Sequence, residues 1–373
     1  MKVLYYFYEL DTPMFKWQYF HIFDELKRYN IDFILFNPGI YGSPEAGNEA
    51  FIEYVRNTTD KFDLFFTCMG DEWLYPETVS MVKEILSIPT VLFCADNLEI
   101  PFSHKSTGKL FDIVWLTSIE TEYLFKKWGC KTVFQTYAAN PYRFVPDWET
   151  QINKVGFIGT PYGSRTNKIN LLLNGDIDCA VYSNSLLHKG YSPSLNGNKN
   201  IRIHDLTTKL SRYVRFPIGR KVLYSSLKNK FISSSKLDLN SEHLEINGSV
   251  PFEGMCNLYS NMALSLNIIE LKNTYILKNP IYKMHLRSFE IPMSGGLQIT
   301  SYNNEIASYF EDGKEIILYR TDEELIDKCH YYLDNKHNKE ILKMKKAAYE
   351  RAKNEHTWYN RFQRVLKEIN IEI

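Results

Sequence analysis

Lys154-Val-Gly-Phe-Ile-Gly159 is the stretch that decides the fold of this 373-residue chain. It reads as a short apolar strand ending in a glycine turn, and a helix that stops at Gly175 follows it. The same alternation of strand and helix already fills the first 145 residues, so the pattern starts again here. Short apolar strands separated by helices favour a parallel sheet that is covered on both faces. We therefore expect an α/β protein with two doubly wound, Rossmann-like domains that face each other across a cleft.

Strands in the first half are expected at 3–8, 31–36, 64–68, 90–94, 113–116 and 133–137. Helical spacing of apolar residues covers 15–29, 50–57 and 77–86. Thr117-Ser-Ile-Glu120 has the spacing of a capping box, which predicts a further helix that ends near Gly129.

Strands in the second half are expected at 177–181, 244–246, 263–267 and 297–300. Thr321-Asp-Glu-Glu324 is a second capping box and predicts a helix to Leu333. The tail from 338 to 369 is mostly helical, with a break near 354–357. Trp358, Phe362 and Leu366 form one apolar stripe that needs a partner surface.

These patterns predict three segments. Residues 1–147 form an N-terminal, acceptor-side domain, and 148–355 form a C-terminal domain with an insertion at 186–242. Residues 356–373 form a helix that returns to the N-terminal domain.

Composition excludes several classes of protein. Lys plus Arg equals Asp plus Glu at 44 each, so the net charge of +0 excludes a nucleic-acid footprint over the whole chain. The six cysteines are scattered, which is typical of reduced cytoplasmic proteins and not of a disulfide framework or zinc site. No apolar run is long enough to span a membrane, and neither GxGxxG nor a P-loop occurs. We expect a cytoplasmic protein.

The insertion at 186–242 is basic and amphipathic. Residues 199–236 contain ten basic side chains and one acid, Asp205. Apolar residues keep helical spacing on both sides of Pro217, the last of them Leu227 and Phe231. Two interpretations follow: peripheral contact with an anionic membrane or a polyanionic glycan, or an apolar stripe that packs on its own domain or on a second subunit.

The segment Lys283–Thr300 offers the strongest candidate site. Lys283, Arg287 and Glu290 share one face if the segment is helical throughout. Basic side chains at the start of a helix suit a diphosphate, and a carboxylate suits the two hydroxyls of a ribose. The alternative is an Arg287–Glu290 surface pair. The acidic pair Asp176 and Asp178 matches the metal-binding pair of some glycosyltransferases, with a polar strand entry as the alternative.

Several of these pieces together resemble the CgeB-like glycosyltransferases, a branch of the group 1 glycosyltransferases with the GT-B fold. They are Arg287-Ser-Phe-Glu290, Gly296, Ser308–Glu315, His356–Arg361, Val155–Thr160 with Arg165, Phe93–Asp96, and Tyr137–Pro141, in which Asn140 replaces the usual Asp. The resemblance does not extend to 186–242.

The resemblance implies transfer of a sugar from a nucleotide-sugar donor to a glycan, glycoprotein or lipid-linked acceptor in bacterial polysaccharide biosynthesis. It implies that Glu290 holds the ribose and that Arg165 and Arg287, with Lys283, hold the diphosphate. Gly159 and Thr160 would approach the donor phosphates, and Val250 would lie at the base. No metal cofactor is expected, because cationic side chains can take up the charge of the leaving diphosphate.

On the acceptor side, Asp96 is the first candidate for a general base and His104 the second. The alternatives are a turn-capping Asp96 and a solvated loop His104. The place of an earlier family glutamate is taken by Tyr282, which leaves retention or inversion open. Two other functions stay open: a nucleotide-sugar epimerase or hydrolase, and a non-catalytic scaffold that binds the nucleotide sugar.

Overall fold

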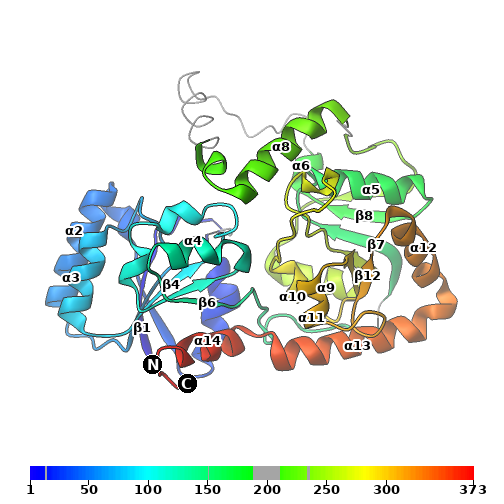
Figure 1. The fold of residues 1–373 in the computed structure, drawn as a ribbon. Coiled ribbons are helices and arrows are strands. Elements are labelled where there is room, and N and C mark those ends of the chain that lie inside the picture. The colour runs from blue at the N-terminus through cyan, green and yellow to red at the C-terminus, as the bar shows by residue number, and fades with distance from the viewer. Residues whose placement is uncertain (13–14, 150, 188–210, 233–235) are drawn as a thin grey trace. The chain divides into compact units, whose positions relative to one another are not determined.

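The computed structural model describes residues 1–12, 15–149, 151–187, 211–232 and 236–373 (Figure 1). The chain forms two compact units. Unit 1 comprises Met1–Asn140 and Thr357–Ile373, and unit 2 comprises Pro141–His356.

Unit 1 is built on a parallel sheet of six strands in the order β2-β1-β3-β4-β5-β6. The strands are β1 Lys2–Tyr6, β2 Asp32–Phe36, β3 Leu64–Thr67, β4 Thr90–Cys94, β5 Ile113–Leu116 and β6 Thr132–Phe134. The central strands β3, β4 and β5 are buried along their whole length. Continuous apolar runs are typical of strands that helices cover on both faces, and this explains the pattern in the sequence.

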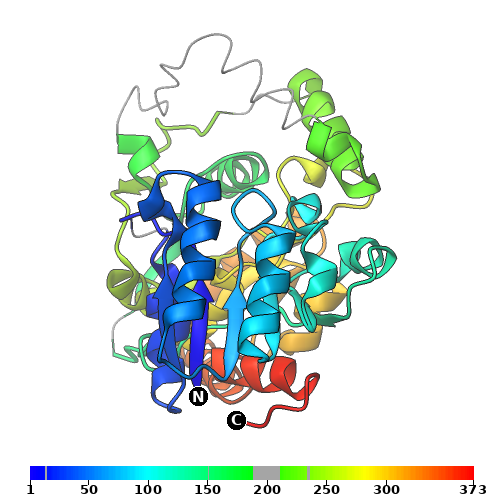
Figure 2. The ribbon, with the colours of Figure 1, turned by 90° about the vertical axis from the view of Figure 1, so that its left-hand side faces the viewer.

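Helices cover the two faces of this sheet. They are α1 Asp24–Lys27, α2 Pro44–Asn57, α3 Pro76–Leu86, α4 Glu122–Lys127 and α14 Trp358–Lys367. Figure 2 shows α2 and α3 side by side over one face, where Phe51 of α2 packs on Phe65 of β3. The next residue of that strand, Phe66, points to the other face and packs on Phe362 of α14.

The last helix, α14, belongs to unit 1 although the preceding helix belongs to unit 2. Its stripe of Trp358, Phe362 and Leu366 is buried, and Trp358 packs on Trp115 of β5. Glu25 accepts hydrogen bonds from the backbone N–H groups of Trp358 and Tyr359 at 3.2 and 2.8 Å, which satisfies donors at the start of this helix.

Unit 2 contains a second parallel sheet, in the order β12-β11-β10-β7-β8-β9. Its strands are β7 Ile152–Ile158, β8 Cys179–Tyr182, β9 Leu244–Asn247, β10 Met262–Leu266, β11 Gln298–Ser301 and β12 Ile317–Tyr319. The connections run outward from β7 in one direction and from β10 in the other. The order therefore reverses between β7 and β10, and doubly wound sheets bind ligands at the carboxyl ends of the strands at such a point.

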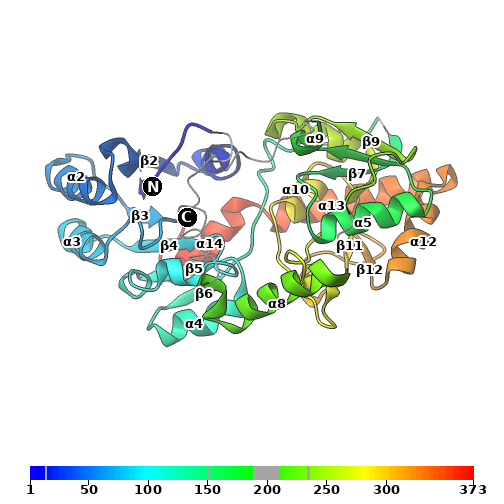
Figure 3. The same cartoon turned by 90° about the horizontal axis from the view of Figure 1, so that it is seen from above.

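The described helices of unit 2 are α5 Ser164–Asn174, α6 Asn184–Leu187, α8 Pro217–Ile232, α9 Phe252–Asn261, α10 Arg287–Met293, α11 Asn304–Tyr309, α12 Asp322–Leu333 and α13 Asn338–Glu355. Figure 3 shows α10 and α12 on opposite sides of the strands. The main core lies on the side of α5 and α12, with Leu172 and Leu325 among its members. Ile291 of α10 and Tyr259 of α9 form a smaller core on the other side.

One expected helix cap is wrong. The hydroxyl of Thr117 does not cap a helix, because it donates to the carbonyl of Ala95 at 2.7 Å. Oδ1 of Asn97 accepts a hydrogen bond from the N–H of Thr117, and α4 begins only at Glu122. The second expected cap is present, since Thr321 accepts from the N–H of Glu324 at 3.2 Å at the start of α12. All six cysteines are free, as expected.

Candidate functional site

A glycine and an arginine meet at the carboxyl end of β7. Gly159 follows the strand with φ of +136°, a conformation that side chains rarely adopt. A β-carbon at this position would lie 2.7 Å from Nη2 of Arg287, the first residue of α10. The absence of a side chain at Gly159 therefore allows the guanidinium group to lie directly against the end of the strand.

Arg287 has an unused hydrogen-bond donor. Its Nη1 is buried and has no hydrogen-bond partner within the described part of the chain. The guanidinium carbon lies 5.4 Å from the ring centre of Phe157 in β7, so one face of the group packs on an aromatic ring. A buried, unsatisfied cationic donor is costly, and an anion at this place would remove the cost.

A second arginine lies nearby. Arg165, in the first turn of α5, donates from Nη1 to the carbonyl of Thr160 at 3.0 Å and packs on the ring of Tyr162 at 4.4 Å. Burial and the charge of Arg287 lower the pKa of Arg165 to about 10. The second of these two causes shows that the two cations lie near each other. The structure thus brings Gly159, Thr160, Arg165 and Arg287 to one place.

Glu290 and Lys283 lie differently from each other. Glu290 is buried one helical turn after Arg287 in α10, and the charges of both residues act on the phenol of Tyr259. The expectation that Lys283 shares this helix face is wrong, because α10 begins at Arg287. Lys283 is instead extended, and its N–H donates to the carbonyl of Ile269 at 2.8 Å.

A cavity of about 580 Å³ opens beside the end of β7, a size within the usual range of small-molecule sites. Gly159 and Thr160 line one part of it, and Val250 lies in the segment expected to meet the base. The structure therefore brings Val250 to the glycine turn.

Sequence reasoning missed the polar side of this cavity, which Ser183, Asn184 and Ser185 form just after β8. Oδ1 of Asn184 accepts from the N–H of Ser249 at 2.8 Å and joins the two loops. The signal was present in the sequence: small polar residues follow a buried strand whose carboxyl end lies at the same sheet edge.

The acceptor-side candidates lie together in unit 1. Asp96 is exposed just after β4, whereas His104 is buried and is not the solvated loop residue of the alternative. Burial lowers the pKa of His104 to about 4, although the charges of Asp71 and Asp96 act in the opposite direction. His104 is therefore neutral near pH 7.

The acidic pair Asp176 and Asp178 lies at the amino end of β8, away from the carboxyl end where the cavity opens. Nδ1 of His243 lies 2.9 Å from Oδ1 of Asp178, and its Nε2 lies 3.6 Å from Oδ1 of Asp176. The positions favour the interpretation of these residues as a polar strand entry.

Part of the basic insertion, 188–210, lies outside the described residues. The described helix α8 is apolar on two faces. Val222 is buried, whereas Tyr224, Leu227 and Phe231 are 59%, 59% and 88% exposed. Leu227 and Phe231 therefore do not pack on the described part of their own domain, and the alternative that they pack on a second subunit stays a prediction. No helix in the described ranges is long and apolar enough to cross a bilayer.

Comparison with known proteins agrees with this architecture. Residues 219–367 match a protein family described as "Glycosyl transferase-like". This match covers the larger part of unit 2 and continues into α14. No curated protein gives a significant match.

Several solved structures share the fold. HepE from Anabaena, in complex with UDP-glucose, is 10% identical with a TM-score of 0.55, and the alignment covers 99% of each chain. Sucrose-phosphate synthase from Thermosynechococcus elongatus is 10% identical with a TM-score of 0.57, again over 99% of each chain. Trehalose 6-phosphate synthase from Burkholderia multivorans is 9% identical with a TM-score of 0.52, over 95% of this chain and 79% of that one.

The chain has the GT-B fold, with two six-stranded parallel sheets flanked by helices, and the expected fold is confirmed. The family match agrees with the expected glycosyltransferase class. The narrower resemblance to the CgeB-like branch stays a prediction, as do the roles of the individual site residues.

Proposed function

We propose that the protein transfers a sugar from a nucleotide-sugar donor, held at the carboxyl edge of the second sheet, to a glycan, glycoprotein or lipid-linked acceptor. One observation carries the proposal. The guanidinium group of Arg287 lies against Gly159 at the end of β7 and keeps a buried donor that has no partner in the described part of the chain. A donor diphosphate supplies the oxygen atoms that such a group needs.

The donor is proposed to lie along the carboxyl edge of the second sheet. The nucleoside occupies the cavity lined by Val250 and Asn184, and the diphosphate lies near Gly159, between Arg165 and Arg287. Glu290 is proposed to accept the ribose hydroxyls. HepE was solved in complex with UDP-glucose, which supports a UDP-sugar as the first donor to test.

The chemistry at this site needs no metal ion. Cleavage of the bond between the sugar and the diphosphate leaves negative charge on the phosphate oxygens. Arg165 and Arg287 are fixed in place before the reaction, so they stabilise this charge without reorganising.

Asp96 is the proposed general base that removes the proton from the acceptor hydroxyl. It is exposed, as a group that touches a substrate must be, whereas His104 is buried. His104 is the weaker candidate for the base, because its side chain is buried.

The exposed face of α8 is proposed to contact an anionic membrane surface that carries the acceptor, at the cytoplasmic face. Tyr224, Leu227 and Phe231 recur at intervals of three and four residues and share this face. Arg220, Lys221, Lys228 and Lys230 lie on the same helix, and residues 211–232 contain no acid. This combination is typical of helices that lie in a lipid headgroup layer.

The test of the proposed function is calorimetric titration of nucleotide sugars into the wild-type protein and the Arg287→Met variant, followed by an assay for sugar transfer. Release of free sugar without an acceptor would favour the hydrolase. Binding without any turnover would favour the scaffold.

A further inference from the structure

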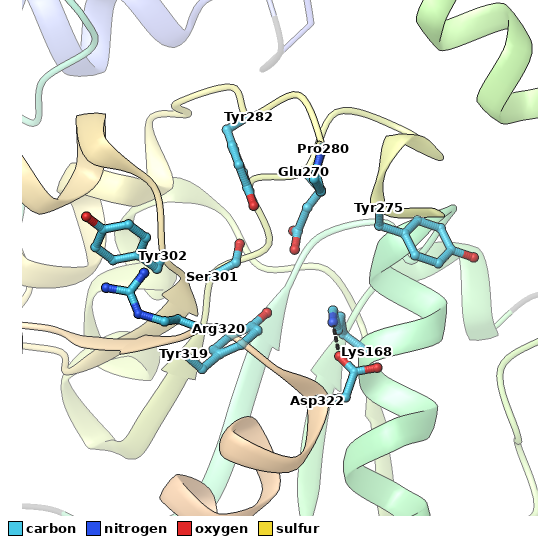
Figure 4. Close-up of a pocket in the computed structure, with 10 residues that line it drawn as sticks. All are labelled: Lys168, Glu270, Tyr275, Pro280, Tyr282, Ser301, Tyr302, Tyr319, Arg320 and Asp322. Atoms are coloured by element: carbon cyan, nitrogen blue, oxygen red, sulfur yellow. Dashed lines mark hydrogen bonds and ion pairs between the residues drawn. The ribbon is translucent and has the colours of Figure 1, made fainter. Parts of the chain in front are cut away.

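Unit 2 contains a second cavity, of about 390 Å³, that does not include the residues of the proposed donor site. It lies where β11 and β12 end, at Ser301 and Tyr319. Figure 4 shows the side chains of Glu270, Tyr282 and Tyr319 pointing toward its interior from different segments of the chain.

A hairpin after β10 forms one wall. The N–H of Leu271 donates to the carbonyl of Ile281 at 2.7 Å, and the N–H of Lys283 donates to the carbonyl of Ile269 at 2.8 Å. Glu270 and Tyr282 face each other in this antiparallel pair. The pairing fixes the backbone of Glu270 and therefore holds its carboxylate at the cavity.

Three oxygen atoms at this cavity are buried without a hydrogen-bond partner among the described residues. They are Oε2 of Glu270, Oγ of Ser301 and the hydroxyl of Tyr319. These three residues are 8%, 6% and 2% exposed, in that order. The two hydroxyls lie near each other but fall short of hydrogen-bond geometry. Buried polar atoms nearly always have partners, so three in one cavity indicate a missing polar ligand.

The charged side chains that line the cavity carry no net charge, because Lys168 and Arg320 offset Glu270 and Asp322. Lys168 forms an ion pair with Asp322, and the guanidinium of Arg320 stacks on the ring of Tyr302 at 3.4 Å (Figure 4). An anion would meet the carboxylate of Glu270, and a metal ion would meet the ammonium of Lys168. Burial and the charge of Glu270 raise the pKa of the Tyr319 phenol, so its hydroxyl keeps its proton and can donate.

We propose that this cavity binds a neutral saccharide ring, as a second carbohydrate site separate from the proposed donor site. A carboxylate accepts hydrogen bonds from two neighbouring sugar hydroxyls, while the hydroxyls of Ser301 and Tyr319 both donate and accept. The tyrosine rings around the opening, among them Tyr275 and Tyr282, offer faces to the C–H groups of a sugar. The cavity volume is within the range of small-molecule sites.

The experiment is saturation-transfer NMR on the full chain with glucose, galactose, mannose and N-acetylglucosamine, each with and without UDP. We expect transfer to at least one of these sugars, and we expect the signal to persist when UDP is present. Glu270→Gln should weaken the binding roughly tenfold or more, because the ligand loses a charged acceptor. The exposed Glu253→Gln is the matched control and should change nothing.

Tyr319→Phe separates binding from folding. The hydroxyl has no partner to lose within the described ranges, so the thermal midpoint of the variant should be unchanged or higher while sugar binding weakens. The absence of transfer to all four sugars in the folded wild-type protein would overturn the proposal. A signal that survives both Glu270→Gln and Tyr319→Phe would also overturn it. Loss of the signal in Arg287→Met alone would assign the sugar to the donor site, so failure of this proposal is distinguishable from failure of the proposed function.

Discussion

Nη2 of Arg287 lies 2.7 Å from the place that a β-carbon would occupy at Gly159. This relationship joins the end of β7 to the start of α10, two segments that are far apart in the sequence. The glycine therefore allows a guanidinium group to reach the carboxyl edge of the sheet.

Gly159→Ala should push Arg287 aside and strain the backbone at φ of +136°. We expect nucleotide-sugar affinity to fall by roughly tenfold or more, as when one charged hydrogen bond is lost. Gly313→Ala is the matched control, because Gly313 also has a positive φ, +76°, but has open space around it. Equal affinities for the wild type and Gly159→Ala, measured by calorimetry, would remove Arg287 from the donor site.

Asp96→Asn tests the general base. The substitution should lower kcat by roughly a hundredfold or more and leave the Kd of the donor unchanged, because Asp96 lies in unit 1 and the proposed donor residues lie in unit 2. His104→Gln should have a smaller effect, because the buried imidazole is not open to an acceptor hydroxyl. A kcat for Asp96→Asn equal to that of the wild type would exclude this residue as the base.

The buried carboxyl group of Glu25 should make the free energy of unfolding of unit 1 depend on pH. Burial raises its pKa to about 8, although the N–H groups of Tyr359 and Trp358 favour the charged form. The unfolded pKa is near 4.5. The folded state therefore binds the proton more tightly, so the stabilisation is present below pH 4.5 and is lost as the pH rises through about 8. One proton gives a slope of at most about 1.4 kcal/mol per pH unit.

Chemical denaturation followed by tryptophan fluorescence measures this slope. Glu25→Gln mimics the neutral acid, so the variant should match the wild type below about pH 4.5 and exceed its stability by an amount that grows until about pH 8. Glu77→Gln, which changes a carboxylate in the first turn of α3, is the control. A wild-type slope that Glu25→Gln leaves intact would show that another group carries the pH dependence.

Vesicle co-sedimentation tests the exposed face of α8. The protein should bind anionic phosphatidylserine vesicles at low salt and not neutral vesicles, because each cation near such a surface adds about 1 kcal/mol. Arg220→Gln with Lys221→Gln should weaken the binding, and so should Leu227→Ser with Phe231→Ser. Lys343→Gln with Lys353→Gln removes the same charge from α13 as a control. Failure of the wild type to sediment with anionic vesicles at low salt would contradict a membrane role for α8.

The sequence was sufficient for the two sheets because their strands are short, apolar and separated by helices or glycine turns. Gly175 ends α5 and Thr321 begins α12, as local chemistry predicts. Predictions from the local sequence were wrong where a distant segment forms a hydrogen bond with the same hydroxyl or N–H group. The hydroxyl of Thr117 bonds the end of β4 instead of a helix, and the N–H of Lys283 bonds Ile269 instead of extending α10.

The candidate site, too, could be predicted from the sequence only in part. Gly159, Arg165, Arg287 and Glu290 were recognisable because they stand within motifs, and the structure brings the glycine and the two arginines together. The cavity at Glu270 was not recognisable, because it exists only once the hairpin closes beside the ends of β11 and β12. Pairing between segments separated in the chain leaves no local signal in the sequence.

The most direct test of the central claim is calorimetric titration of UDP-glucose and other nucleotide sugars in the presence of EDTA. We predict that at least one binds to the wild-type protein without metal, and that a concentration of 100 Kd raises the free energy of unfolding by about 2.7 kcal/mol. Arg287→Met and Glu290→Gln should each weaken that binding, with a loss of about 1.5–3 kcal/mol for the carboxylate. Binding that requires Mg²⁺ or Mn²⁺, or affinity that neither variant changes, would contradict the account.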